Sequence, residues 1–403
     1  MGLFDRLRGT AEERFARRVL GAMRDAGVAR ARYLPDQFAI EVHRDSADDP
    51  GTIAYLGNIF RECERAGRGE QRERIAAFLA AIIYHPGAPE SWEGVAPLLR
   101  PLLRTATFGL GVARSGPGPL RRPAWGHLAE FVVVDQPTSL LYVTPKQLQD
   151  WGVTEQAVFD RARRNMTELA RRTSEASEAS EAPGPRSLIR MVESGDAYWA
   201  SHLFVEGWLA SLRSRVGGQP LLFVPDTTGV MLVGRGAEDT PDSLGKVFAL
   251  VEQEYHEAAR PISPMAFTVD DSGTVVPFLP PPGDPLHEIA HRTEVIIASS
   301  EYAAQAQHLE SDAFVAACTV VQRSDETLFT VASWADKVDT LLPRADFVAF
   351  SADGAETFFV PWAAVEREVD LEPEPGLDPP RYRLREWPHP GVIERLRRVA
   401  TRP

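Results

Sequence analysis

The spacing of hydrophobic positions predicts a mainly helical beginning for this chain. Apolar side chains recur there every three or four residues, as they do on one face of an amphipathic helix. The clearest segment starts at Thr10, which can form a capping box with Glu13, and ends near Gly27. Cys63 falls on the apolar side of a later helix, so we expect it in the core. These patterns predict a helical module over residues 1–110.

Further along the chain, the pattern changes to short apolar, β-branched runs separated by turn residues. Turns at 135–139, 226–229 and 270–273 each lie between two such runs, which predicts antiparallel hairpins. A helical pattern separates the last two hairpins, so residues 221–279 form a ββαββ-like unit. The fold class is therefore α+β, with hairpin and helix units following the helical module. We assign residues 124–280 to this second domain.

Two further segments complete the predicted organisation. A Ser-Glu-Ala repeat at 173–186 lacks apolar side chains, so we expect a disordered loop there. After a Pro-Pro-Pro-Gly turn, a helix over about 286–310 and several strand-like runs indicate a C-terminal α+β domain at 284–365. Residues 366–403 have the composition of a Pro/Glu-rich tail that ends in a short helix. Residues 188–213 have a helical pattern.

Composition narrows the class of protein. The chain has 403 residues, of which 44% are hydrophobic and 25% charged, as in ordinary globular proteins. Its two cysteines favour a reducing compartment over a disulfide framework. No apolar run is long enough to span a membrane, and the N-terminus lacks a signal-peptide core. We therefore expect a cytoplasmic protein that does not bind a membrane.

The charge distribution does not predict a nucleic-acid surface. All but three of the 44 basic residues are arginines, which together with 32 prolines is typical of a GC-rich bacterial genome. Residues 1–125 hold 19 basic and 15 acidic residues, although the whole chain has a net charge of −13. The arginines alternate with glutamates on helical faces, which is typical of a solvated surface rather than a nucleic-acid footprint.

Three segments in the middle of the chain resemble a known family. They are the Leu-Leu-Tyr-Val-Thr-Pro-Lys-Gln run from Leu140 with its following helix, the Ser-Gly-Asp-Ala-Tyr-Trp-Ala-Ser run at 194–201, and the Leu-Leu-Phe-Val-Pro-Asp hairpin strand at 221–226. Together they resemble the YtpQ-like bacterial family of unknown function over residues 1–280. The Ser-Glu-Ala repeat and the C-terminal domain depart from that family's pattern. The resemblance implies a soluble bacterial protein and assigns no catalytic residue.

One motif carries candidate chemistry. Residues 287–291 read His-Glu-Ile-Ala-His, which matches the H-E-x-x-H pattern of zinc peptidases. In that pattern His287 and His291 bind the metal from consecutive helical turns, and Glu288 activates a water molecule. A catalytic zinc needs a third protein ligand, for which Glu310 has a tolerable spacing.

Other readings of the same motif remain open. His308 and Asp312 also have suitable spacing for a third ligand, and metal binding without catalysis is a further alternative. The charged residues at 292–294 are unlike those that follow the motif in metallopeptidases. The same residues also fit the plain start of an amphipathic helix.

The sequence thus predicts a non-enzymatic interaction protein whose partner is another protein. The alternative is a zinc-dependent hydrolase that uses residues 287–291. A phosphate-binding loop and a complete dinucleotide-binding fingerprint are missing from the sequence, so we expect no cofactor other than zinc in that alternative.

Overall fold

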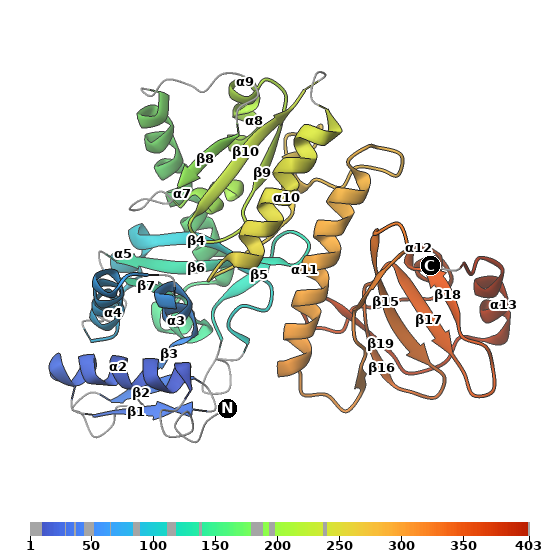
Figure 1. Ribbon diagram of the computed structural model, residues 1–403, viewed down its shortest axis with the longest axis horizontal. Coiled ribbons are helices and arrows are strands. Elements are labelled where there is room, and N and C mark those ends of the chain that lie inside the picture. Colours follow the sequence, from blue (N-terminus) through green and yellow to red (C-terminus); the bar gives the residue numbers. More distant parts are fainter. Residues whose placement is uncertain are drawn as a thin grey trace. The chain divides into compact units, whose positions relative to one another are not determined.

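The structure of the protein is a computed structural model, shown in Figure 1. It describes residues 10–28, 30–35, 38–43, 52–64, 66–83, 89–110, 118–136, 139–178, 188–192, 198–236 and 240–401. The chain forms two compact units. Unit 1 comprises Met1–Pro89 with Asp135–Leu141, and unit 2 comprises Glu90–Val134 with Tyr142–Pro403. No described helix is long and apolar enough to cross a membrane. The combination of helices with mainly antiparallel sheets confirms the α+β class.

The described part of unit 1 combines three helices with a small antiparallel sheet of order β1-β2-β3. Its described elements are α2 (Ala11–Asp25), β1 (Arg30–Leu34), β2 (Ala39–His43), β3 (Thr52–Tyr55), α3 (Gly57–Glu64) and α4 (Arg68–Ile83). Thr10 and Glu13 form the predicted capping box at the start of α2. Gly27, in the left-handed region at φ 86°, follows its end.

The core of unit 1 is built from the apolar faces that the periodicity predicts. Phe15, Val19 and Met23 of α2 are buried against Ile40 of the sheet and other side chains. Cys63 is 1% exposed and belongs to this core, as predicted.

Unit 2 begins with a small sheet of order β4-β6-β5. The elements along this stretch of the chain are α5 (Trp92–Val95), η2 (Ala96–Leu98), β4 (Leu99–Thr105), β5 (Arg121–Pro123), β6 (Leu128–Gln136), β7 (Ser139–Tyr142), α6 (Pro145–Trp151) and α7 (Glu155–Glu178), and most of β7 falls in the Asp135–Leu141 segment of unit 1. The predicted helical module over 1–110 is therefore too long, because β4 pairs along its length with β6. Pro101 is accommodated because β4 is an edge strand.

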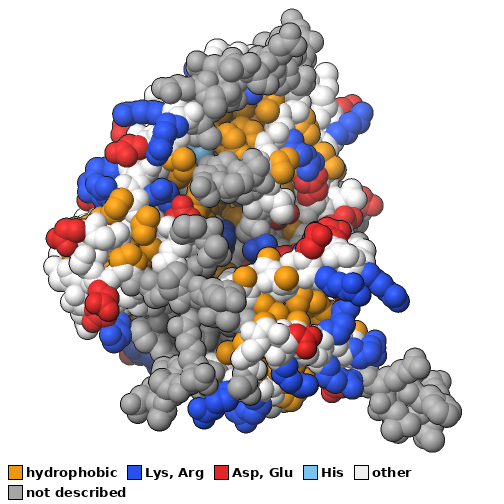
Figure 2. Space-filling view, turned by 90° about the vertical axis from the view of Figure 1, so that its left-hand side faces the viewer, with side chains coloured by type: hydrophobic (Ala, Val, Ile, Leu, Met, Phe, Trp, Pro, Cys, Tyr) orange, Lys and Arg blue, Asp and Glu red, His pale blue; other side chains and the backbone are white. Residues whose placement is uncertain are grey.

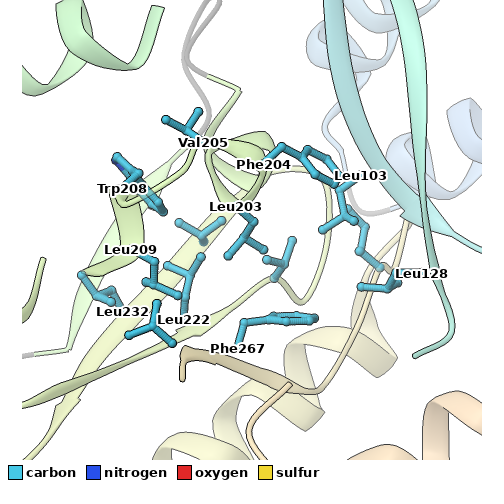
Figure 3. Close-up of a cluster of buried hydrophobic side chains, with 14 of the residues drawn as sticks. Leu103, Leu128, Leu203, Phe204, Val205, Trp208, Leu209, Leu222, Leu232 and Phe267 are labelled. Atoms are coloured by element: carbon cyan, nitrogen blue, oxygen red, sulfur yellow. The ribbon is translucent and has the colours of Figure 1, made fainter. Parts of the chain in front are cut away.

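The next sheet contains the predicted ββαββ unit. It has the order β12-β11-β9-β10-β8 and is antiparallel throughout. The elements are β8 (Ile189–Val192), η4 (Trp199–Phe204), α8 (Trp208–Ser211), α9 (Arg213–Val216), β9 (Gln219–Phe223), β10 (Gly229–Arg235), α10 (Pro241–Glu257), β11 (Ala266–Val269) and β12 (Val275–Pro277). Side chains of η4 and α8, including Leu203, Phe204 and Trp208, pack on Leu222 and Phe267 of this sheet (Figure 3).

Two predictions for this region are wrong. The stretch 188–213 is not one helix, because β8 pairs with β10 and extends the sheet before the short helices begin. The Ser-Glu-Ala segment is not a loop over its whole length, because α7 continues to Glu178. The rest of that repeat and Asp196 lie outside the described residues.

The C-terminal part of unit 2 has two more sheets, β13-β16-β19 and β14-β15-β17-β18. Its elements are α11 (His287–His308), β13 (Phe314–Val315), β14 (Thr319–Gln322), β15 (Leu328–Ala335), β16 (Thr340–Pro343), β17 (Phe347–Ser351), β18 (Phe358–Pro361), α12 (Trp362–Glu368), β19 (Arg381–Leu384) and α13 (Pro390–Arg398). The pairs β13–β16 and β15–β17 are parallel, whereas the other pairs are antiparallel.

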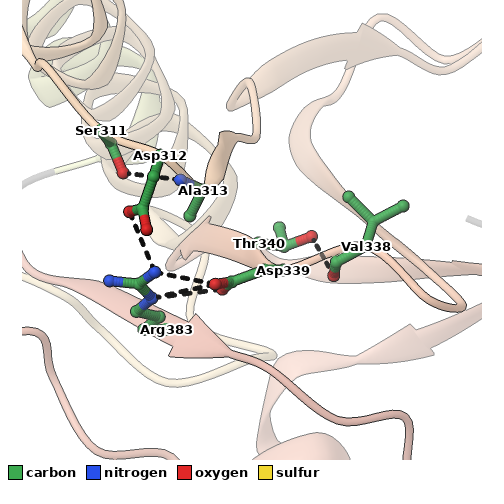
Figure 4. A network of polar contacts seen from close by, with 7 residues as sticks. All are labelled: Ser311, Asp312, Ala313, Val338, Asp339, Thr340 and Arg383. Atoms are coloured by element: carbon green, nitrogen blue, oxygen red, sulfur yellow. Dashed lines mark hydrogen bonds and ion pairs between the residues drawn. The ribbon is translucent and has the colours of Figure 1, made fainter.

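The predicted tail is part of this fold rather than an appendage. Its strand β19 pairs with β16, and Arg383 of β19 bonds Asp312 and Asp339 at 3.0 and 2.8 Å (Figure 4). The short terminal helix is confirmed as α13, whose Leu396 is fully buried.

Helix α11 joins the two predicted domains 124–280 and 284–365 within unit 2. Near its start, Leu286 and Ala290 pack in the core that also contains Leu221 and Phe248. On the other side, α11 contacts β14 and β15 of the C-terminal sheet. A boundary at residues 280–283 therefore separates two stretches of sequence but not two compact bodies.

Candidate functional site

The His-Glu-Ile-Ala-His motif forms the first turns of α11, as predicted. The rings of His287 and His291 stack with their centroids 6.0 Å apart. Each ring already has a hydrogen-bond partner, because His287 Nδ1 lies 2.7 Å from the Pro280 carbonyl oxygen and His291 Nε2 lies 2.7 Å from Asp346 Oδ1. Glu288 is exposed at the start of the helix.

The predicted ligand set of His287, His291 and Glu310 does not come together. Glu310 follows the end of α11, so about 30 Å of helix separates it from the histidines at 1.5 Å per residue. His308 is the last residue of the same helix, and Asp312 bonds Arg383. In the part of the chain that the structure describes, no three His, Cys, Asp or Glu side chains are grouped to hold a metal ion.

His291 instead belongs to a hydrogen-bonded chain that links α11 to the C-terminal sheet. Asp346, just before β17, accepts from His291 with Oδ1 and from the Thr330 backbone N–H and hydroxyl with Oδ2, at 2.7 and 2.8 Å. Two donors from β15 therefore fix the Asp346 carboxylate, and the carboxylate orients the imidazole.

This chain lines a cavity of about 320 Å³, which we call the α11 pocket. Helix α11 contributes His291 and Glu294 to its wall, one turn apart. Other polar or aromatic side chains come from four separate segments: His127, Thr330, Arg344, Asp346, Trp362 and Glu366. The pocket thus brings together residues that are distant in the sequence and lie entirely within unit 2.

The surroundings shift the acid–base properties of four groups in this pocket. The hydrogen bond to Asp346 raises the pKa of His291, against the effect of burial. Burial tends to raise the pKa of Asp346, but bonds from His291 and Thr330 hold it below the usual value. Burial raises the pKa of Glu294. Burial, with a contribution from Arg344, lowers the pKa of His127 to about 4, so its ring is neutral at pH 7.

Two ring nitrogens of the pocket residues have no protein partner. His127 Nδ1 and Trp362 Nε1 are inaccessible to solvent, and neither makes a hydrogen bond to a described residue. An indole nitrogen can only donate, and Trp362 is 5% exposed. A buried donor without an acceptor costs about 1–3 kcal/mol, and because neither atom has accessible surface, a ligand in the cavity does not reach it in this structure.

Unit 1 carries a cavity of a different kind, which we call the α2–α4 groove. Its volume is about 680 Å³. Its walls come from two helices: Arg18, Ala22, Asp25, Ala26, Arg68, Gln71, Arg72, Ile75, Ala76, Leu79 and Ala80.

The groove has an apolar floor and a basic rim. Ile75 and Leu79 are buried beneath it. The side chains of Arg68 and Arg72 are exposed and make no ion pair with any described residue. In the space-filling view, hydrophobic side chains reach the surface beside Lys and Arg side chains in the lower part of the face (Figure 2).

Comparison with known proteins finds no matching family, no matching characterised protein and no matching solved structure. The resemblance to the YtpQ-like family therefore stays a prediction. The case for function must come from the two cavities themselves.

Sequence reasoning found one member of the α11 pocket and missed the others. His291 could be identified from the sequence because its motif spans only five consecutive residues. One signal could have identified Arg344 and Asp346, since they are charged residues between two apolar strand-like runs. His127 and Trp362 carry no such signal, because only the tertiary fold places them beside α11.

Proposed function

We propose that this protein is a non-enzymatic interaction protein whose α2–α4 groove binds an amphipathic helix of another protein, with acidic residues flanking the apolar stripe of that helix. The observation that carries the proposal is the combination of a large apolar cavity with rim arginines that form no ion pair with a described residue. We place this function in the bacterial cytoplasm, which agrees with the arginine-rich composition and with two cysteines that form no disulfide.

The dimensions of the groove favour a helix as the occupant. On α4 the lining residues run from Arg68 to Ala80, which corresponds to about 18 Å, or three helical turns. Each wall also presents two alanines one turn apart, Ala22 with Ala26 and Ala76 with Ala80. Short side chains at this spacing let the apolar anchors of a third helix approach both walls.

The charge of the rim favours acidic residues on that helix. Arg18 donates to Gln71 Oε1 at 2.9 Å, whereas Arg68 and Arg72 make no ion pair with any residue that the structure describes. Asp25 is the single acid in the lining. Complementary charges at a rim mainly accelerate association and select between partners. Screening by salt should therefore weaken binding.

The alternative zinc-dependent hydrolase has less support. Its third predicted ligand, Glu310, lies at the far end of α11. His287 and His291 each direct one ring nitrogen to a protein acceptor, which leaves the other nitrogen available, so the observation against the site is the lack of a third ligand among the described residues.

A designed peptide tests the proposal. The probe is a fluorescein-labelled helix of 16 residues with one leucine stripe flanked by glutamates, and its partner probe has lysines in place of the glutamates. We expect fluorescence anisotropy to show binding of the acidic peptide to the full chain and much weaker binding of the basic one. The double variant Arg68→Glu/Arg72→Glu should weaken the acidic complex at least tenfold.

The matched control is Arg24→Glu, which makes the same kind of charge change on α2 outside the groove lining. We expect it to change the affinity less than twofold. The proposal fails if the acidic peptide does not bind, or if all three proteins bind it equally. Preferential binding of a duplex DNA probe by residues 68 and 72 would instead identify the rim as a nucleic-acid surface.

A further inference from the structure

The α11 pocket contains charges of both signs that are not fully matched within the protein. His291 and Asp346 form a bonded pair at 2.7 Å, so the Asp346 carboxylate already has a partner within the protein. Beyond that pair, the pocket is lined by the half-buried carboxyl group of Glu294 and by the exposed side chains of Glu366 and Arg344. None of these three side chains makes a hydrogen bond or a close ion pair with a described residue.

The lining of the pocket comes from separate parts of the fold. Trp362 belongs to α12, His127 to the loop before β6 and Glu294 to α11. Groups from three separate segments thus surround one cavity, as is typical of a binding site for a small molecule.

The balance of charge selects the class of ligand. A simple anion would face the carboxylates of Glu294 and Glu366, and a simple cation would face the guanidinium of Arg344. A molecule with both an anionic and a cationic group can satisfy both sides of the pocket. The cavity of about 320 Å³ lies at the small end of ligand sites, which span about 300–1,000 Å³.

We infer that the α11 pocket is a binding site for a small zwitterion of the α-amino acid class, with Arg344 receiving the carboxylate and Glu294 receiving the ammonium group. His291 is a positioning residue in this arrangement, because Asp346 fixes its ring beside Glu294. The inference is independent of the groove in unit 1 and does not rest on the proposed function.

Thermal unfolding of the full chain tests the inference with a panel of the twenty common L-amino acids, each measured separately. A ligand present at a hundredfold excess over its Kd should raise the melting temperature of unit 2 by about 5 °C. Each ligand that produces a shift is then compared with its amide, which lacks the carboxylate, and with its N-acetyl form, which lacks the ammonium group. We expect both derivatives to bind at least tenfold more weakly than the free amino acid.

Two variants assign the ends of the ligand. Arg344→Met should lower the affinity for the free amino acid at least tenfold but leave the affinity for the amide nearly unchanged. Glu294→Gln should also lower the affinity for the free amino acid at least tenfold, but it should leave the affinity for the N-acetyl form nearly unchanged. Glu310→Gln, the matched control at the other end of α11, should not change any affinity.

Three results would overturn the inference. The first is an unchanged melting temperature with all twenty amino acids. The second is equal affinity for the free and derivatised forms, and the third is an equal loss of affinity for every ligand in both variants. Binding of inorganic phosphate or acetate alone would show an anion site instead. Circular dichroism of each variant distinguishes a lost site from a lost fold. Trp362 provides a second readout, because its fluorescence should respond to a ligand in this pocket and not to a peptide in the unit 1 groove.

Discussion

Units 1 and 2 differ in whether polar side chains are buried in the core. Among the described residues, the buried side chains of unit 1 are all apolar, and its arginines stand on the surface. In unit 2 the interior contains charged groups, of which Glu130 and Arg381 have no exposed surface and Glu301 has 4%. Water screens the charges of unit 1, whereas the charges of unit 2 must be satisfied by the protein around them.

The buried charges of unit 2 are satisfied in two ways. Glu130 receives charge-assisted hydrogen bonds from Arg122 and Arg163 at 2.7 Å. Among the described residues, Arg381 has no carboxylate partner. It donates to Gln305 Oε1 at 2.6 Å and to backbone carbonyl oxygens, including that of Ala316 at 2.7 Å. Burial lowers the pKa of Arg381 accordingly.

This difference teaches how each unit can recognise a partner. A surface arginine can meet an acidic group of a partner at little desolvation cost, which suits a groove for another protein. Polar groups held inside a fold are preorganised, which suits a pocket for a small molecule. The distribution of tryptophan makes the comparison measurable, since all eight tryptophans lie at positions assigned to unit 2.

The largest expected effect comes from Arg381. We expect Arg381→Met to destabilise unit 2 by about 3–5 kcal/mol, because the change removes a buried network and leaves Gln305 and several carbonyl oxygens unsatisfied. Urea unfolding followed by tryptophan fluorescence measures this loss. The control Arg385→Met, at an exposed position just after β19, should stay within about 0.5 kcal/mol of the wild type. A similar effect of both variants would refute the structural role of the buried guanidinium.

An intermediate effect is expected from acid. The pKa of His127 falls from its usual 6.5 to about 4 on folding, so the unfolded chain binds a proton that the folded chain rejects. The contribution of His127 to stability is therefore complete above pH 6.5 and is lost as the pH falls from 6.5 toward 4. The loss amounts to at most about 3 kcal/mol.

The variant His127→Asn should remove this part of the pH dependence. His202, whose pKa burial also lowers to about 4, will keep a slope of the same sign in both proteins. The measurement is the free energy of unfolding from tryptophan fluorescence at pH 7, 5.5 and 4. If the wild type and the variant lose the same stability between pH 7 and 4, His127 does not titrate as the structure indicates.

The smallest effect on stability is expected in unit 1. Arg68→Glu/Arg72→Glu should change the free energy of unfolding by less than about 0.5 kcal/mol, because both side chains are exposed and unpaired. The change also places acidic residues in the first turns of α4, where the helix dipole favours them. Far-ultraviolet circular dichroism during urea unfolding follows both units and tryptophan fluorescence follows unit 2, so the part of the dichroism change that fluorescence does not match belongs to unit 1. A loss above about 1 kcal/mol would show that the two arginines support the fold and are not reserved for a partner.

The sequence by itself determined the local elements whose signals lie within a few residues. The capping box at Thr10, the helix at 287–308, the hairpins of the ββαββ unit and the terminal helix follow from short-range spacing and turn chemistry. It also indicated that Cys63 belongs to a core, because helical periodicity identifies the buried face.

Only the tertiary structure decided how distant segments combine. Strand β19 pairs with β16 although its sequence has the composition of a tail, and β8 forms because β10 is available beside it. The separation of 55 residues between His291 and Asp346 has no periodic signature. The same holds for His127 and Trp362. Hydrophobic periodicity predicts which face of a helix or strand is buried, but it does not predict which other helix or strand packs against that face. Both cavities depend on that packing.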